Sequence, residues 1–569
     1  MTKDEAAAAL REIGTILELQ GENPFKCRAY QTAARTLETA PADLAELVRS
    51  GRLAELPGIG ESLREKIITL VTTGKLPYLQ KLRASLPPGL LPLLDLPGLG
   101  PKKLKVLREK LKIESRETLE KACQDGRLAA LEGFGEKTAA NLLGAIARRA
   151  AYGKLHRLGE ALPVAQEILA RLKKCQAVQK AEIGGSLRRG KEVVKDLDLI
   201  ACSSQPAEVM KIFTTAPLVE KVVAHGETKS SVLLSGGLPC DLRVVPAESW
   251  ATALAHFTGS KEHNIAMRQR AIERGLHLSE WGLFRNGSKK ALPLKEEKDL
   301  HRALDLAYLP PEIREDQGEI PAAEKKKLPE LVTRGQIRGC LHNHTIASDG
   351  QDTLEAMAQA AADLGLEWLG IADHSRSSFQ AHGLDEKNLL AQINAIRAYN
   401  KKRPACHLLA GTECDILKGG KLDFSDSILA ELDYVIASIH AGFSSDEKEN
   451  TARLVRAMEN PHVTCLGHPT GRLLLEREPY PVNLLKILEA AAETGTWIEL
   501  NCNPWRLDLD WRWWHRARDL GVLCCLNPDA HQTGHLRFLD LGVTVARKGW
   551  LRAQDVVNTR TLAQLKKLL

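Results

Sequence analysis

The second half of the chain contains a repeated arrangement that restricts the fold more than any other feature of the sequence. Between residues 336 and 569, short apolar runs are separated by segments with helical periodicity, and most runs end in His, Asp or Glu, as in "LGIADHS" and "YVIASIHAG". Strands that alternate with helices favour a parallel sheet. Because the carboxyl ends of parallel strands converge on one face of a barrel, we expect these polar side chains to meet there.

Nine residues in this half are candidate metal ligands. A single histidine at a strand end is more often a structural residue, so the hypothesis depends on the whole set. "LHNHTIASDG" places His342 and His344 two positions apart and hence on one face of a strand. Imidazole and carboxylate ligands favour zinc, manganese or iron over calcium. The candidates are His342, His344, Asp349, His374, Glu413, His440, His468, Asp529 and His531.

Charge and cysteine content separate the two halves and limit the class of protein. Residues 1–335 hold 53 Lys+Arg against 43 Asp+Glu, whereas residues 336–569 hold 26 against 29, together with 11 of the 17 histidines. A basic front half predicts a polyanionic partner. Twelve scattered cysteines without CxxC pairs indicate reduced thiols in a cytoplasmic protein. We expect no membrane span and no signal peptide.

Three stretches of the front half share a Gly-apolar-Gly pattern that opens an amphipathic helix. They are "LPGIG", "LPGLG" and "LEGFG", which begin at Leu56, Leu96 and Leu131. Glycines permit a tight turn, and free N–H groups at a helix N-terminus bind phosphate. One copy would be ordinary turn chemistry, but three on a basic segment predict helix-hairpin-helix units that bind the DNA backbone. The glycines concerned are Gly58, Gly60, Gly98, Gly100, Gly133 and Gly135.

"VVKDLDLIA", residues 193–201, predicts a strand with two carboxylates on one face. Strand side chains alternate, so Asp196 and Asp198 are expected to point the same way. A solvated acidic edge strand would account for the pair, and so would a divalent cation that offsets their repulsion. A second predicted strand, "LPCDLRVVP", carries one further acid, Asp241.

Two turns accompany these strands. "IGGSLRRG", residues 183–190, precedes the first strand, and its Gly-Gly-Ser turn leaves backbone amides free. Arg188 and Arg189 follow, so the segment is typical of a cradle for a triphosphate. "HFTGS", residues 256–260, is a glycine turn directly after an aromatic residue.

In this order the motifs resemble those of the family X DNA polymerases, over residues 1–318. The resemblance implies an α+β nucleotidyltransferase palm and a thumb, and it favours the cation over the acidic edge. Asp196 and Asp198 would bridge two Mg²⁺ ions, and Asp241 would bind the catalytic one. The residues matched to the incoming nucleotide are Gly185, Ser186, Arg189, Phe257 and Gly259.

The first hairpin carries one further matched residue, Lys66. In the β polymerase of this family, a lysine at this place forms a Schiff base with an abasic sugar, which requires an uncharged amine. A lysine that contacts phosphate or solvent is the alternative, and the sequence favours it over the lyase role.

The second half, residues 336–569, is similar to the PHP domain, named for polymerase and histidinol phosphatase. All nine candidate positions hold the residue types of that family's ligands. The resemblance implies a distorted α/β barrel in which they bind three ions of Zn²⁺, Mn²⁺ or iron for phosphoester hydrolysis.

The resemblances divide the chain into six segments. They are a helical lyase-like domain with the first hairpin at 1–80, a helix-hairpin-helix fingers domain at 81–150, the palm at 151–250, the thumb at 251–318, a charge-dense linker at 319–335 and the PHP domain at 336–569.

This order of segments matches the bacterial family X polymerases. We expect a monomeric enzyme of base excision repair that fills short gaps in DNA with dNTPs. Its PHP domain would act as a 3′-5′ exonuclease that processes 3′ ends, and AP endonuclease activity remains open. A PHP phosphoesterase whose front half only binds DNA is the alternative, and a non-catalytic DNA scaffold is a third. The intact Asp196, Asp198 and Asp241 favour the polymerase.

Overall fold

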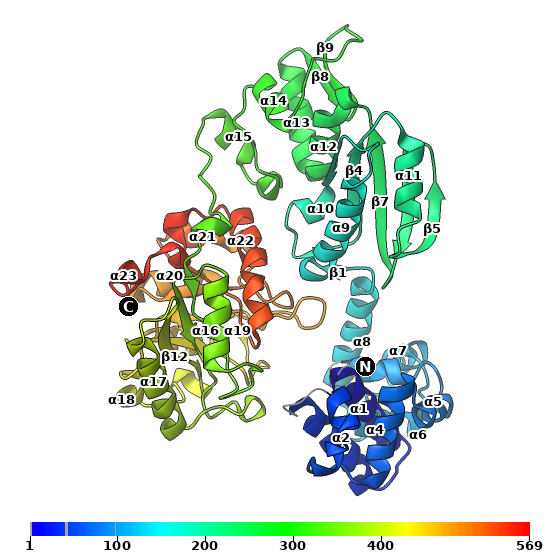
Figure 1. Cartoon of the computed structure of the whole chain (residues 1–569), viewed down its shortest axis with the longest axis vertical. Coiled ribbons are helices and arrows are strands. Elements are labelled where there is room, and N and C mark those ends of the chain that lie inside the picture. The colour runs from blue at the N-terminus through cyan, green and yellow to red at the C-terminus, as the bar shows by residue number, and fades with distance from the viewer. Residues whose placement is uncertain (1–2, 40–43, 97) are drawn as a thin grey trace. The chain divides into compact units, whose positions relative to one another are not determined.

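The computed structural model describes residues 3–39, 44–96 and 98–569 (Figure 1). The chain divides into two compact units, Met1–Gly153 and Lys154–Leu569. Among the described residues, no helix is long and apolar enough to cross a bilayer. All twelve cysteines lie within the described ranges, are buried and carry free thiols.

In the part of the first unit that the structure describes, all regular structure is helical, and the helices pack around one apolar core. The predicted hairpin turns are present. Gly58, Gly98 and Gly133 have φ angles of 78°, 80° and 85°, a backbone conformation that is strained for any residue with a side chain. The helices are α1 (Lys3–Leu19), α2 (Pro24–Thr39), α3 (Leu44–Arg49), α4 (Glu61–Thr73), α5 (Pro77–Ala84), α6 (Pro101–Leu111), α7 (Arg116–Gln124) and α8 (Gly135–Tyr152).

The second unit begins with the predicted α+β region, which contains a five-stranded sheet in the order β2-β4-β7-β6-β5. β4 and β7 are parallel, and the other neighbours are antiparallel. The strands are β2 (Lys180–Ile183), β4 (Leu197–Cys202), β5 (Val219–His225), β6 (Lys229–Leu234) and β7 (Leu238–Val245). β1 (His156–Arg157) and β3 (Val193–Val194) form a separate antiparallel pair. The helices of this region are α9 (Leu158–Lys173), α10 (Gly185–Arg188) and α11 (Pro206–Thr214).

The predicted strand at 193–201 is therefore interrupted. β3 ends at Val194 and β4 begins at Leu197, so Asp196 precedes the regular strand while Asp198 lies within it. The two acids do not share one continuous strand, which limits the argument from alternation.

Most of the region after the sheet packs around a separate apolar cluster, whereas Trp250, Ala253 and Leu254 pack against the sheet itself. Its elements are α12 (Trp250–Thr258), α13 (Lys261–Glu273), β8 (Leu276–Ser279), β9 (Gly282–Arg285), α14 (Glu297–Ala303) and α15 (Glu319–Glu324). The predicted linker at 319–335 is ordered at both ends. α15 packs on this cluster with Glu319 hydrogen-bonded to His263, and the amide of Val332 donates to the Leu551 carbonyl. Charge density alone did not reveal these anchors.

The predicted parallel barrel is confirmed, as seven strands that follow one another in sequence order. The strands are β10 (Gly339–Cys340), β11 (Trp368–Ile371), β12 (His407–Asp415), β13 (Tyr434–Ser438), β14 (Cys465–Leu466), β15 (Trp497–Asn501) and β16 (Cys524–Asn527). The helices between the strands include α16 (Leu354–Asp363), α17 (Glu386–Lys401), α18 (Asp426–Leu429), α19 (Glu447–Met458), α20 (Leu484–Thr494) and α21 (Trp514–Asp519). After the last strand come α22 (Leu539–Lys548) and α23 (Leu562–Leu565) (Figure 1).

The barrel is nearly closed and filled by side chains. A parallel bridge between Asn343 and Ala530 joins the segments that follow the first and last strands. The Tyr434 ring lies against Gly370 and Gly411, and its hydroxyl donates to the Leu341 carbonyl at 2.5 Å. A packed interior of this kind leaves the carboxyl ends of the strands as the open face.

Candidate metal centres

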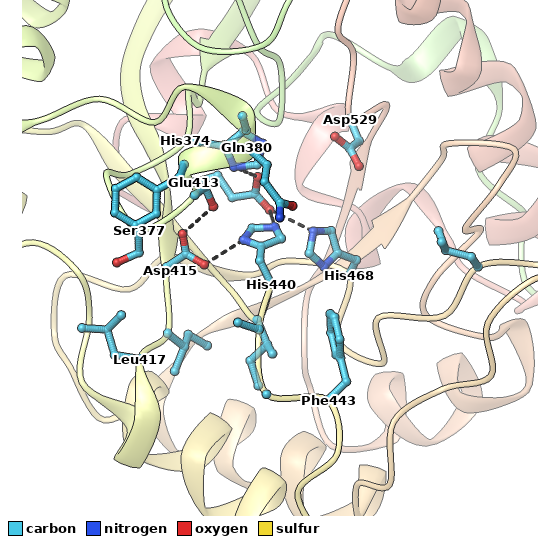
Figure 2. Close-up of a pocket in the computed structure, with 18 of the residues that line it drawn as sticks. His374, Ser377, Gln380, Glu413, Asp415, Leu417, His440, Phe443, His468 and Asp529 are labelled. Carbon is cyan, nitrogen blue, oxygen red and sulfur yellow. Dashed lines mark hydrogen bonds and ion pairs between the residues drawn. The ribbon is translucent and has the colours of Figure 1, made fainter. Parts of the chain in front are cut away.

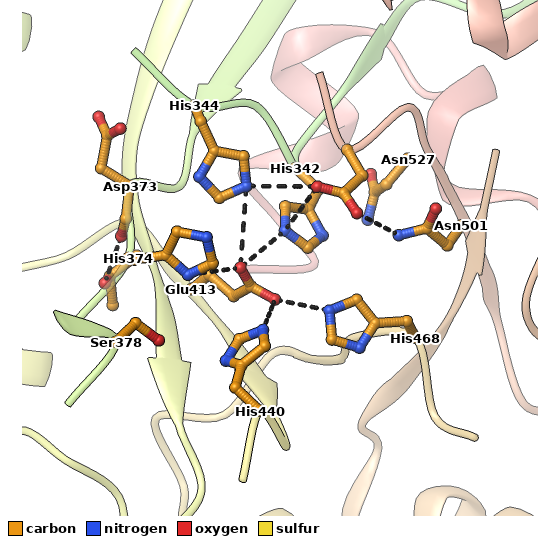
Figure 3. Close-up of polar contacts among 12 residues, drawn as sticks. His342, His344, Asp373, His374, Ser378, Glu413, His440, His468, Asn501 and Asn527 are labelled. Carbon is orange, nitrogen blue, oxygen red and sulfur yellow. Dashed lines mark hydrogen bonds and ion pairs between the residues drawn. The ribbon is translucent and has the colours of Figure 1, made fainter. Parts of the chain in front are cut away.

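All nine candidate ligands come together at the carboxyl ends of the barrel strands. Figure 3 shows Glu413 at the centre, surrounded by histidines of this set. Glu413 Oε1 lies 2.9 Å from His468 Nε2 and 3.1 Å from His440 Nε2. Its other oxygen lies 3.0 Å from His374 Nδ1 and 3.2 Å from His342 Nε2. One carboxylate thus contacts imidazoles that follow four different strands.

Two further carboxylates complete the cluster. Asp529 Oδ1 lies 3.4 Å from His344 Nε2, and Asp349 Oδ2 lies 3.4 Å from His531 Nε2. Within the described part of the chain, three groups have ligand atoms within 4.8 Å of one another. They are His344, Asp349, His374 and His531, then His342, His344 and Asp529, and finally His374, Glu413 and His440.

The donor atoms of this cluster suit metal ions. Among the described residues, buried ring nitrogens of His342, His344, His374 and His468 make no hydrogen bond, and neither does Glu413 Oε1. Buried polar atoms are otherwise almost always paired. Unpaired imidazole nitrogens beside carboxylates are the ligands that zinc and manganese prefer, so the residues fit such ions.

The carboxylates and imidazoles of the cluster shift one another's pKa values. Burial raises the pKa of Glu413, but His342 and His440 outweigh burial and hold that pKa well below its usual value. Burial and the neighbouring imidazoles lower the pKa of His344 to about 4. Glu413 and His344 are thus in the form that binds metal, whereas His374 and His440, whose pKa values Glu413 raises to about 10 and about 9 against the effect of burial, would release a proton on binding it.

The structure also reveals two carboxylates that our sequence interpretation missed. Glu499, on β15, accepts a hydrogen bond from His342 Nδ1 at 2.7 Å, and Asp415, on β12, accepts one from His440 Nδ1 at 2.9 Å. Such partners fix the orientation and tautomer of a metal-binding histidine. A signal was present in each case, because Glu499 interrupts the apolar "TWIELN" and Asp415 follows Glu413 by two positions.

The cluster opens into a cavity of about 1070 Å³ (Figure 2). Arginine and lysine side chains from Lys418, Arg477 and Arg506 line it, and so do the aromatic rings of Phe443 and Trp505. Basic and aromatic groups around carboxylates and imidazoles are suited to an anionic ligand with planar rings.

The acids of the α+β region form a second, more open group. Asp198 on β4 and Asp241 on β7 are direct neighbours in the parallel register, and Asp196 is exposed. Burial and, after it, the charges of Asp196 and Asp241 raise the pKa of Asp198 to about 6. Lys229 Nζ lies 2.7 Å from Asp241 and partly compensates this negative charge. Clustered carboxylates with a raised pKa fit Mg²⁺.

The turn of the predicted triphosphate cradle lies against these acids. A Cβ atom on Gly185, whose φ angle is 60°, would fall 2.1 Å from Asp198 Oδ2, so only glycine allows this approach. Ser186, the next residue, is partly exposed. Arg189 is placed differently from the expectation, because its guanidinium is buried and bonds Glu315 and the Thr258 carbonyl.

The other matched nucleotide residues occupy the end of α12. Phe257 lies under the guanidinium of Arg243, at 4.4 Å from ring centroid to Cζ, and the Gly259 amide donates to the Ala255 carbonyl. A Cβ atom on Gly259 would lie 2.7 Å from Asn264 Oδ1, so the turn is tightly packed.

In the first unit, the hairpin glycines stand where the helices begin. Gly60 and Gly100 are the N-cap residues of α4 and α6, and having no side chain they leave the first N–H groups of those helices to a ligand. Lys66 donates to Ser62 Oγ at 2.7 Å, and its ammonium lies 5.2 Å from the centre of the Tyr78 ring. These contacts are compatible with either predicted role of Lys66.

Comparison with known proteins gives matches along the chain. Domain families described as "Helix-hairpin-helix domain", "SAM-like Helix-hairpin-helix tandem", "DNA polymerase beta thumb" and "PHP domain" match residues 1–76, 90–148, 253–315 and 341–503. The "DNA polymerase/3′-5′ exonuclease PolX" of Bacillus subtilis (strain 168) is 39% identical over 573 residues, which cover 100% of this chain and 99% of that protein. A probable phosphatase of Thermoanaerobacter sp. (strain X514) is 28% identical over 230 residues, 38% of this chain and 89% of that protein.

Proposed function

Because this chain belongs to the family X DNA polymerases that combine helix-hairpin-helix domains with a C-terminal PHP domain, we propose that it is a DNA polymerase and a 3′-5′ exonuclease. One observation carries the proposal: nine imidazole and carboxylate residues converge in a chain that matches such a protein along its whole length. We further propose short gaps in DNA, as in base excision repair, as the substrate for synthesis from dNTPs.

In the palm, Asp196, Asp198 and Asp241 would hold Mg²⁺. When bound, Mg²⁺ lowers the pKa of a primer 3′-hydroxyl and neutralises the triphosphate. Asp198 must be ionised for this role. Its pKa is raised to about 6, and a bound Mg²⁺ would lower it again because a nearby positive charge favours the carboxylate form. Gly185 lets the backbone of the turn approach these acids closely, and Ser186 would contact the triphosphate.

In the barrel, the nine residues would hold zinc or manganese, which when bound activate water and stabilise phosphoryl oxygens. Glu499 and Asp415 would keep His342 and His440 in the tautomer that binds metal. The basic residues of the cavity would hold the phosphates of a DNA 3′ end. Its volume of about 1070 Å³ would admit abasic or blocked ends, which is the basis for proposing AP endonuclease activity.

A lyase role for Lys66 remains a separate proposal that rests on its matched position. Borohydride trapping on incised abasic DNA tests it. Wild type should cross-link and Lys66→Ala should not, and equal cross-linking by the two would remove Lys66 from this role.

The principal test separates the two activities on one gapped DNA substrate. Asp241→Asn removes a charge from the palm and leaves every barrel ligand in place, so it should abolish primer extension and spare degradation. His344→Ala should do the reverse. If Asp241→Asn lost degradation as completely as extension while still folded and bound to DNA, the two-site assignment would fail. If wild type degraded but never extended, the phosphoesterase with a DNA-binding front half would be the better description.

A further inference from the structure

Lys548, the last residue of α22, is a cation with no exposed surface that links the barrel to the polymerase half of the same unit. Its ammonium donates to the Glu315 carboxylate at 2.5 Å, to the Arg189 carbonyl at 3.1 Å and to the Glu312 carbonyl at 3.3 Å. These bonds use all three N–H donors of a lysine ammonium. The barrel therefore supplies a buried positive charge to the region that carries the nucleotide turns.

Glu315 is shared between two cations. Its Oε1 atom accepts from Lys548 and also from Arg189 Nε, at 2.9 Å. Arg189 Nη1 then donates to the Thr258 carbonyl at 2.8 Å, between Phe257 and Gly259. A continuous chain of buried bonds thus runs from α22 to both turns that are matched to the incoming nucleotide.

The helix that carries Lys548 also lies directly against the turn that carries Arg189. A Cβ atom on Gly190 would fall 2.4 Å from Thr544 Cγ2, and the φ angle of Gly190 is 65°. Any other residue type would be strained at this φ angle and would have to displace the Thr544 side chain, so the turn and α22 are in close contact here.

The ion pair between Arg189 and Glu315 competes with the binding of a nucleotide by Arg189. The resemblance to the family X polymerases matches Arg189 to the incoming nucleotide, yet here its guanidinium is committed to Glu315. A buried carboxylate left without any cation is strongly destabilised, because nothing compensates its charge. With Lys548 in place, Glu315 keeps one cation when Arg189 turns away. Burial lowers the pKa of Lys548 to about 8, and Glu315 opposes that shift, so the lysine is mainly protonated at pH 7.

We propose that Lys548 is a positioning residue for nucleotide binding, which holds the charge of Glu315 so that Arg189 can exchange that carboxylate for the triphosphate of a dNTP. This rests on the proposed polymerase function. It gives a helix of the PHP barrel a part in the palm that is separate from the barrel's own metal cluster.

The test is a steady-state measurement of single-dNTP incorporation on gapped DNA by the full-length protein. Lys548→Met removes the charge with little change in side-chain length. We expect the KM for dNTP to rise about tenfold or more, the equivalent of about 1.4 kcal/mol, with a smaller change in kcat and unchanged 3′-5′ degradation. Glu315→Gln removes the charge that retains Arg189. The double variant Lys548→Met/Glu315→Gln should therefore return the KM toward the wild-type value.

Arg547→Met is the matched control. Arg547 precedes Lys548 on α22 and joins the same two regions, but its bonds go to the Glu312 carboxylate and the Val332 carbonyl. If Lys548→Met acted only by weakening the contact between α22 and the polymerase half, Arg547→Met would raise the KM for dNTP as well. In that case, adding Glu315→Gln to Lys548→Met would not restore the KM.

Either of those two results would overturn the inference, as would an unchanged KM in Lys548→Met. If wild type incorporated no nucleotide at all, the polymerase function itself would fail and the inference with it. If Lys548→Met does not fold, Lys548→Gln replaces it in the test. This variant is also neutral but can still donate to two carbonyls, and we expect the same rise in the KM for dNTP.

Discussion

Replacement of Glu499 by glutamine would remove one charge from the centre of the barrel while keeping the shape of the side chain. Glu499 has no exposed surface and receives four hydrogen bonds. Its Oε1 accepts from His342 Nδ1 at 2.7 Å and Asn527 Nδ2 at 2.9 Å, and its Oε2 accepts from the His468 amide at 2.5 Å and Asn501 Nδ2 at 3.2 Å. Every neighbour is a donor, so both oxygens must accept.

Glutamine offers only one oxygen, and its amide would face two donors in either orientation. If the oxygen stays on His342, the amide opposes the His468 backbone. If it turns, His342 loses the partner that fixes its tautomer. A hydrogen bond to a charged group contributes roughly 1.5–3 kcal/mol, and loss of such a partner typically lowers metal affinity or activity about 10- to 100-fold. We expect a loss in that range for degradation.

The assay measures metal bound per chain after dialysis against a graded chelator, together with the rates of 3′-5′ degradation and primer extension. Glu493→Gln is the control, because Glu493 is an exposed residue near the end of α20 and the chemical change is the same. Extension should stay at the wild-type level in both variants. Unchanged metal retention and degradation in Glu499→Gln would refute the role assigned to this carboxylate.

Three other outcomes follow from single contacts. Glu297 is buried, but its partners Arg314 and Arg188 outweigh burial and lower its pKa to about 2. Glu297 should therefore contribute about 3 kcal/mol to the free energy of unfolding above pH 4.5. That contribution should disappear as the pH falls from 4.5 toward 2, and Glu297→Gln should flatten this part of the stability profile in urea unfolding. Gly185→Ala should abolish extension but not degradation, since its Cβ atom would collide with Asp198. Lys102→Ala, an exposed change on α6, should lower by about 1 the slope of log affinity for gapped DNA against log salt, measured by fluorescence anisotropy.

Much of the barrel site could be predicted because its geometry follows from local rules. Parallel strands bring their carboxyl ends together whatever the sequence between them, and this gathers the ligands. The strand predicted at His342 and His344 is shorter than expected, because β10 ends at Cys340 and both histidines follow it. Glu499 was missed for a related reason. A carboxylate inside an apolar strand is informative only when the partner that compensates it is known, and His342 lies 157 positions away.

The palm shows the same division between local and distant effects. The register that pairs Asp198 with Asp241 follows from two apolar strands, each with an acid near its start. The position of Arg189 does not follow from "GSLRRG", because the residue that captures its guanidinium, Glu315, lies 126 positions later in a segment without a recognisable motif.

Lys548 marks the limit of sequence reasoning most clearly. A lysine at the end of an amphipathic helix normally reaches solvent and interacts favourably with the last carbonyls of the helix. "LDLGVTVARKGW" gives no reason to expect otherwise, yet Lys548 is fully buried because Glu315, 233 positions earlier, compensates its charge. Glu315 supplies the negative charge that makes burial of the Lys548 ammonium possible, so the two residues define one feature of the molecule. Its effect on nucleotide binding is measured by comparing Lys548→Met with the double variant Lys548→Met/Glu315→Gln.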